Sequence, residues 1–173
     1  MKKRSFKLFA ITLFSSLLLL FGCTENTETE TQDKNIQTME AVLKNNLTGP
    51  SDELQQILKE KEWMERLRKY EEKLYKDYFA DDASYVAFVG SYGSVLMNEP
   101  MRNNYKLKVK NIDFEKTDSE EIIYNFSVEL HYQKEGSENT EVEIVTGQAN
   151  LNEDHKIENM LIRIGDFLGS LSN

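Results

Sequence analysis

The chain has 173 residues and is acidic, with 21 basic and 30 acidic side chains and a formal net charge of −9 at pH 7. Phosphate backbones repel such a chain, so nucleic acid is excluded as a partner. A single cysteine cannot form an internal disulfide. Apart from this cysteine, the sequence contains only two histidines. It therefore offers no metal or redox site and predicts no cofactor.

The first 22 residues are arranged like a secretory signal peptide. Basic side chains open the chain, and an apolar stretch follows over residues 8–21. A helix that spans a membrane needs about 20 apolar residues, so this stretch is short for a permanent anchor and has the length of a signal core. We therefore expect residues 1–22 to be a signal peptide. The basic residues are Lys2, Lys3, Arg4 and Lys7.

The end of this stretch, Leu20-Phe21-Gly22-Cys23, resembles the lipobox of bacterial lipoprotein precursors. Leu20 and Gly22 match that pattern, whereas Phe21 is larger than the residue usual at its position. The resemblance implies that the Cys23 thiol receives a diacylglyceryl group and that cleavage makes Cys23 the first mature residue. The alternative is an ordinary signal or an uncleaved anchor with an incidental cysteine.

Two acyl chains on one cysteine form a stable membrane tether. Each buried methylene contributes about 0.8 kcal/mol, and one chain alone binds only reversibly. Charge cannot replace the lipid, because the chain without its signal carries 17 basic and 30 acidic side chains, a formal charge of −13. Anionic headgroups repel such a chain. We expect a palmitate-type lipid anchor that holds the protein on the extracytoplasmic face of the cell membrane.

Residues 23–35 are predicted to form a disordered acidic linker that starts at the lipidated Cys23. Residues 24–34 contain no apolar side chain, and threonine alternates with glutamate along part of their length. The remaining residues, 36–173, have the size of one domain that buries its core without disulfides.

The first part of this domain has the apolar spacing of helices. Apolar residues recur every three or four positions from Ile36 to Leu47, and Ser51 is expected to be the N-cap of the next helix. The predicted helices cover residues 36–47, then 51–79 as two helices or one bent helix, and then a short helix near residues 85–96 that Pro100 stops.

The second part has the alternation of strands. Every second residue from Ile122 to Tyr132 is apolar, which makes this the clearest strand of the chain. The alternation shifts by one position near Lys110-Asn111, which indicates a β-bulge, and again after Ile144. The predicted strands cover residues 105–114, 122–133, 141–151 and 157–164, and Phe167 and Leu168 are expected to fold back over the sheet.

Helices followed by antiparallel strands with short turns predict an α+β fold, with N-terminal helices packed on a curved antiparallel sheet of about four strands. Several segments then resemble a family of small lipoproteins from Gram-positive bacteria: LTGPSDEL (47–54), YKDYF (75–79), YKLKVKNIDFEK (105–116), VTGQANLNEDHKI (145–157) and IRIGD (162–166). Their domains are nuclear transport factor two-like, within the cystatin-like architecture. The resemblance implies a cone-shaped half-barrel and a membrane location, and it implies no established activity.

Some enzymes with this cone, such as ketosteroid isomerases and dehydratases, place an acidic or imidazole base among aromatic walls. Here the residues expected to line the cone are Tyr92, Tyr124, Phe126, Val128 and, after the bulge, Asp113. No catalytic or metal-binding residue is assigned among them.

The two histidines are not expected to act as bases. His131 falls on the opposite face of its strand beside Glu129, which predicts a solvated partner. His155 lies in the charged turn NEDHK and is expected to be exposed.

The sequence therefore favours a membrane-anchored binding or accessory module. Its ligand would be a peptide, a partner protein or a small apolar molecule near Tyr124, Phe126 and Tyr92. An isomerase or hydrolase that uses the cone as its active site is the alternative, and a purely structural role in an envelope or sporulation assembly is a third reading.

Overall fold

The structure is a computed structural model of the chain, and it describes the backbone of residues 25–171 and the side chains of residues 34–171. The expected signal peptide, the lipobox residues Leu20, Phe21 and Gly22, and Cys23 lie outside the described residues. Contacts along the chain divide it between Lys34 and Asn35, and the unit that begins at Asn35 contains the sheet and every helix except the first residues of the N-terminal one.

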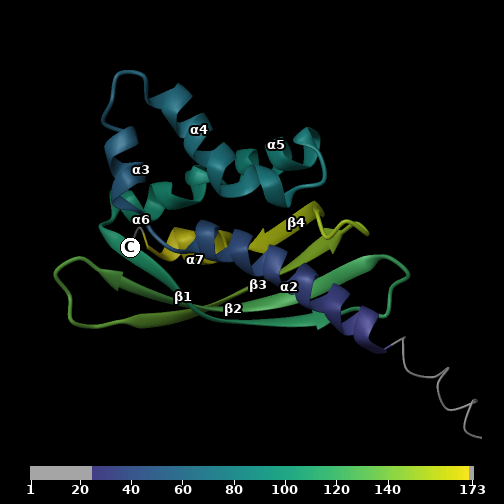
Figure 1. Ribbon diagram of the computed structural model, residues 1–173. Coiled ribbons are helices and arrows are strands. Elements are labelled where there is room, and N and C mark those ends of the chain that lie inside the picture. Colours follow the sequence, from purple (N-terminus) through teal and green to yellow (C-terminus); the bar gives the residue numbers. More distant parts are fainter. Residues whose placement is uncertain (1–24, 172–173) are drawn as a thin grey trace, which may run out of the picture. The chain divides into compact units, whose positions relative to one another are not determined.

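The chain forms helices first and strands second, and the expected α+β class is confirmed (Figure 1). Strands β1 to β4 follow one another in the sheet in chain order, and every neighbouring pair is antiparallel. The helices pack on one face of this open sheet. The strands are β1 (Tyr105–Lys116), β2 (Ile122–Lys134), β3 (Glu141–Leu151) and β4 (Ile157–Arg163).

The helices fall close to where the apolar spacing predicts them. The stretch after Ser51 forms two helices, as one of the two predictions had it. The helices are α2 (Glu25–Leu47), α3 (Asp52–Ile57), α4 (Trp63–Tyr75), the 3₁₀ helix η1 (Lys76–Tyr78), α5 (Asp82–Ser91), the 3₁₀ helix η2 (Ser94–Met97), α6 (Asn98–Arg102) and, after the sheet, α7 (Gly165–Ser170). The first of these, α2, begins inside the segment for which the sequence predicts a disordered linker.

The loop between α2 and α3 is fastened to the sheet. Gly49 exchanges two backbone hydrogen bonds with Leu107 of β1, at 3.0 and 2.6 Å. Directly afterwards, the Ser51 hydroxyl accepts the backbone N–H of Leu54 at 3.1 Å, so Ser51 is the N-cap of α3 as predicted. The loop is thus bound to β1 at Gly49, and two residues later Ser51 begins α3.

One predicted helix end is wrong. Pro100 does not stop a helix; it lies inside α6, which begins at Asn98. The first residues of a helix have backbone N–H groups without an intrahelical acceptor, so a proline loses no hydrogen bond there. The apolar stretch before it is divided by Gly93 into α5 and η2.

The core lies between α2 and the sheet. The even-numbered residues of β2 from Tyr124 to Leu130 are buried, as the alternation predicts, and the buried residues of α2 pack in the same cluster. The α2 residues are Met39, Val42, Leu43 and Leu47, and none of them is exposed.

The two expected shifts of alternation have different outcomes. The bulge in β1 is confirmed, because the pairing with β2 shifts between Val109 and Asn111. The shift expected after Ile144 is wrong, because β3 pairs with β2 without interruption. Val142 and Ile144 lie on the open face of the sheet, 52% and 53% exposed, while Val145 points to the helices.

Candidate ligand-binding site

Three of the residues expected to line a cone are core residues. Tyr124, Phe126 and Val128 are 1%, 3% and 0% exposed and pack against the helices. A ligand could reach them only by displacing those helices. The buried side chains of all four strands are apolar or tyrosine, so this face carries no buried acid or imidazole base within residues 105–163.

Tyr92 is separated from these three residues. It follows α5 and is half-buried, with its ring centroid 5.7 Å from that of Phe88. Together they line a pocket of about 380 Å³ between α5 and β4, which includes Ser84 and Met160. The structure therefore does not bring Tyr92, Tyr124 and Phe126 together in one cavity.

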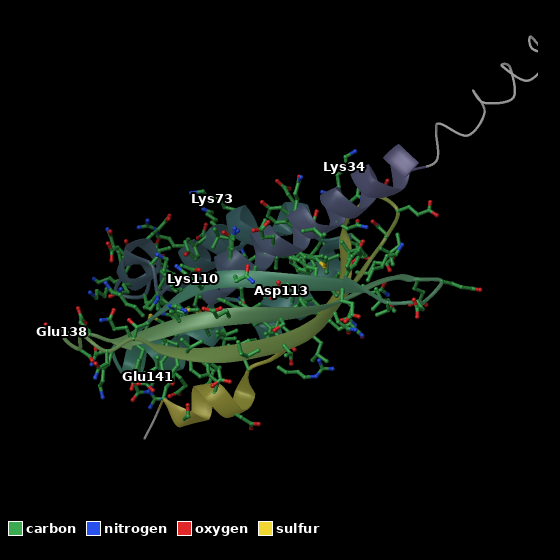
Figure 2. The ribbon with its side chains drawn as sticks, turned by 90° about the horizontal axis from the view of Figure 1, so that it is seen from below. Lys34, Lys73, Lys110, Asp113, Glu138 and Glu141 are labelled. Atoms are coloured by element: carbon green, nitrogen blue, oxygen red, sulfur yellow. The ribbon has the colours of Figure 1, made fainter. Side chains whose placement is uncertain are left out.

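The placement of Asp113 inside the cone is wrong. The bulge turns Ile112 and Phe114 toward the helices, and Asp113 between them consequently points to the open face. Figure 2 views the sheet from the side away from the helices and shows Asp113 on that face of β1. Its two carboxylate oxygens each accept the Asn111 amide at 3.2 Å, which is the geometry of an exposed local contact.

The two histidines differ in their environments. His131 lies on the open face, and its Nε2 is 2.6 Å from Glu129 Oε1, as the sequence predicts. His155 is not exposed, contrary to prediction. It is half-buried, and its Nδ1 lies 2.9 Å from Oδ1 of Asn35, which is itself 1% exposed.

The buried titratable groups of the helical layer are tyrosines. Burial raises the pKa of Tyr75, against a smaller opposing effect of the Asn46 amide. Burial also raises the pKa of Tyr85 to about 12, and the carboxylates of Glu71 and Glu72 add to the shift. Both tyrosines are therefore neutral donors at neutral pH, and neither is prepared to act as a base.

Another pocket, at one end of the sheet, combines polar and apolar side chains. We call it the α3–α6 pocket. It has a volume of about 250 Å³ and lies between α3, α6, the start of β1 and the turn after β2. Its lining residues are Pro50, Gln55, Leu58, Lys59, Met101, Asn104, Tyr105, Lys106 and Glu135.

A backbone hydrogen bond holds two walls of this pocket together. The N–H of Glu135, after β2, donates to the carbonyl oxygen of Asn104 at 2.7 Å. Asn104 adopts φ +56°, a left-handed conformation that asparagine tolerates, and this turns the chain from α6 into β1. The pocket wall is thus formed by paired backbone rather than by a free loop.

The pocket combines an apolar floor with unpaired charge. Leu58, Met101 and the Tyr105 ring supply apolar surface, and the Tyr105 ring is 6.0 Å from that of Tyr132. Lys59 and Lys106 are exposed, and neither forms an ion pair with any residue in the range 34–171. An apolar body that carries one anionic group fits this arrangement.

Sequence reasoning did not find this pocket. Its residues come from three separate segments, 50–59, 101–106 and 135, and none of them forms a motif.

Two further observations concern the described residues alone. They contain no group of three or more Asp, Glu, His or Cys side chains that could hold a metal ion, and among their helices none is both long and apolar enough to cross a membrane. Comparison with family models, curated proteins and solved structures gives no significant match to this chain.

Proposed function

We propose that this protein is a lipid-anchored, extracytoplasmic binding module that takes a small amphipathic anion in the α3–α6 pocket. The observation that carries the proposal is the pair Lys59 and Lys106 beside an apolar floor, without ion-pair partners among the described residues. In a chain with nine more acidic than basic charges, two unpaired lysines at one concave site provide a local attraction for anions.

The proposed location rests on the sequence. Residues 1–22 have the layout of a signal peptide, and Leu20-Phe21-Gly22-Cys23 resembles a lipobox, so Cys23 would carry the anchor. The proposed relationship to nuclear transport factor two-like lipoproteins has the same basis. Helices on one face of an antiparallel four-stranded sheet are compatible with such a cone and support the proposal.

The alternative of an isomerase or hydrolase finds less support. Such a reaction requires an acid or base beside the substrate, and the buried side chains of the four strands are apolar or tyrosine. The α3–α6 pocket contains one carboxylate, Glu135, opposite two lysines, and this combination suits recognition of charge.

The experiment compares two probes of the same size and opposite charge, 2-naphthoate and 2-(aminomethyl)naphthalene. Binding to the full chain in amphipol is measured by calorimetry. We expect the naphthoate to bind more tightly. The variants Lys59→Ala and Lys106→Ala should each weaken it roughly three- to five-fold, as for a partly exposed charge contact.

The control is Lys108→Ala. Lys108 lies on the same strand as Lys106 and has the same charge, but it does not line the pocket. Glu135→Gln should strengthen naphthoate binding, because it removes the one carboxylate at the site. Equal binding of both probes, or equal losses in Lys106→Ala and Lys108→Ala, would show that the pocket does not select anions.

A further inference from the structure

One half of β3 has a strand on only one side. Residues Glu141–Val145 pair with β2, from Tyr132↔Glu141 to Val128↔Val145. On the other side, β4 pairs only with residues 146–151, because it ends at Arg163. The chain then leaves the sheet and enters α7 at Gly165, and the ring centroid of Phe167 in α7 lies 4.9 Å from that of Tyr132 on the helix side. Among the residues that the structure describes, no strand therefore pairs with this side of residues 141–145, and we call this stretch the β3 edge.

The backbone of the β3 edge offers free hydrogen-bonding groups. In an antiparallel sheet, alternate residues direct both their N–H and C=O to the same neighbour. Within residues 34–171, no backbone hydrogen bond reaches residues 141–145 from any partner other than β2. A pocket of about 300 Å³ lies where the missing strand would continue. Its lining residues are Glu143, Ile144, Val145, Arg163, Ile164, Gly165, Asp166 and Phe167.

The two faces of the β3 edge differ in chemistry. Val142 and Ile144 lie on the open face and are about half exposed. Glu141 and Glu143 alternate with them and point to the side of the helices. There the Tyr132 hydroxyl donates to Glu141 Oε2 at 3.0 Å, and burial together with these two carboxylates raises the Tyr132 pKa. An added strand would meet apolar side chains on one face and carboxylates on the other.

The charge beside the β3 edge is negative, whereas Lys59 and Lys106 of the α3–α6 pocket lie on the β1 side of the same end of the sheet. Carboxylates of Glu138, Glu141, Glu143 and Asp166 surround the β3 edge or its turn, against the single guanidinium of Arg163 (Figure 2). None of these five groups forms an ion pair within the part of the chain that the structure describes. A second copy of this chain would bring the same carboxylates against each other, so self-association at this edge is disfavoured.

We propose that the β3 edge binds an extended segment of a partner protein in which basic and apolar residues alternate. The segment adds a strand beside residues 141–145, and its backbone pairs with the free N–H and C=O groups. Its lysine or arginine side chains lie next to Glu141 and Glu143, and its apolar side chains lie next to Val142 and Ile144. This site is distinct from the α3–α6 pocket and does not depend on it.

The test uses three octapeptides of equal length: the alternating basic SKVKIKVS, its acidic counterpart SEVEIEVS and the rearranged SVKKIVKS. Hydrogen–deuterium exchange of the full chain in amphipol gives the position of binding, and fluorescence anisotropy gives the affinity. We expect SKVKIKVS at saturation to slow exchange over residues 141–145 by at least about five-fold. The acidic peptide should not bind, and the rearranged peptide should bind at least about five-fold more weakly.

Two variants and one control locate the contact. Glu143→Gln should weaken SKVKIKVS binding roughly three-fold, and Ile144→Lys should abolish the exchange protection. The control Leu161→Lys makes the same change at another exposed apolar residue, on β4 and away from the β3 edge, and should leave binding unchanged. Thermal unfolding of each variant shows that it is folded.

Several results would overturn the proposal. If SKVKIKVS and SVKKIVKS bind equally, the contact is one of net charge and no strand is added. Protection outside residues 141–145, or an equal effect of Leu161→Lys, would place the peptide elsewhere. A concentration-dependent dimer protected at residues 141–145 would make a second copy the occupant.

Discussion

The imidazole of His155 donates from Nδ1 to Oδ1 of Asn35 at 2.9 Å, across 120 residues of sequence. Asn35 lies in α2 and is buried, whereas His155 lies in the turn between β3 and β4 with φ +62°. The side chain of Asn152 holds the same turn by accepting the backbone N–H groups of Asp154 and Lys156, both at 3.0 Å. One side-chain pair therefore connects a helix to the far end of the sheet.

Asn35→Ala should lower the free energy of unfolding by about 1–2 kcal/mol, since it removes a half-buried hydrogen bond and leaves the imidazole unpaired. His155→Ala should have a similar effect. The double variant should lose less free energy of unfolding than the two single variants added together, because both changes remove the same contact. Denaturant unfolding of the full chain measures all three, with Gln37→Ala, an exposed change in the same helix, as the control. Strict additivity would contradict the coupling.

Gly147 lies directly opposite Phe126 in the pairing of β2 and β3. A Cβ at this position would lie 2.1 Å from Cζ of Phe126 and 2.2 Å from the carbonyl oxygen of Leu161. Gly147→Ala should therefore destabilise the protein by about 3 kcal/mol, and Phe126→Leu should recover only part of the loss, because the Leu161 oxygen belongs to the backbone. Gly90→Ala is the control. Apart from its chain neighbours and the backbone of its own helix, no atom of the described residues lies within 4 Å of its Cβ position, so it should be neutral or stabilising. A neutral Gly147→Ala would disprove the close packing.

The sheet was predictable where apolar residues occupy one face only. In β2, the apolar residues of the alternation from Tyr124 to Leu130 are the buried ones. The bulge in β1 was predicted from the same alternation, which shifts by one position there. In β3, Val142 and Ile144 are apolar but lie on the open face. The alternation of apolar residues therefore predicted a shift that does not exist. Apolar side chains on an open face cannot be distinguished from core residues by spacing alone.

The candidate sites were less predictable than the fold. The α3–α6 pocket requires Lys59, Lys106 and Glu135 to meet, and these residues come from segments far apart in the sequence that only the tertiary fold brings to one pocket. His155 was expected to be exposed because its neighbours are charged. Its contact with Asn35 depends on the left-handed backbone at that position, and no local pattern encodes the partner.

Glu71 of α4 connects two segments of the helical layer. Its Oε1 accepts the backbone N–H of Ser94 at 2.7 Å, at the start of η2. Glu71→Ala should destabilise the protein by about 1.5–3 kcal/mol, because a buried N–H loses a charged acceptor, and Glu71→Gln should cost less since an oxygen acceptor remains. The neighbouring Glu72 forms an exposed pair with Arg68, so Glu72→Ala should cost at most about 0.5 kcal/mol in the same unfolding assay. Equal losses at Glu71 and Glu72 would refute this assignment.

Stability should fall at alkaline pH through the buried tyrosines. The pKa of Tyr85 is about 12 in the folded protein, and that of Tyr75 is also raised, against about 10 in an unfolded chain. The folded state therefore retains protons that the unfolded state releases. Their contribution is fully present below pH 10 and is lost as the pH rises toward 12. Urea unfolding between pH 9 and 12 should show this decline, and it should be shallower in Tyr85→Phe. An unchanged slope in that variant would contradict the raised pKa.

The proposed lipid anchor predicts a specific dependence on Cys23. In a Gram-positive host grown with labelled palmitate, the native chain should incorporate label and sediment with membranes. Cys23→Ala should abolish labelling, because no other cysteine is present to carry the diacylglyceryl group. The domain should then be released or remain as the uncleaved precursor, which mass spectrometry distinguishes by the presence of residues 1–22. The control is Phe21→Ala, which places a smaller residue before Gly22 and leaves Cys23 in place, so it should keep the label. Continued labelling of Cys23→Ala, or an unmodified thiol on the native chain, would refute the anchor. The proposed anion binding in the α3–α6 pocket would be unaffected, because its test does not involve Cys23.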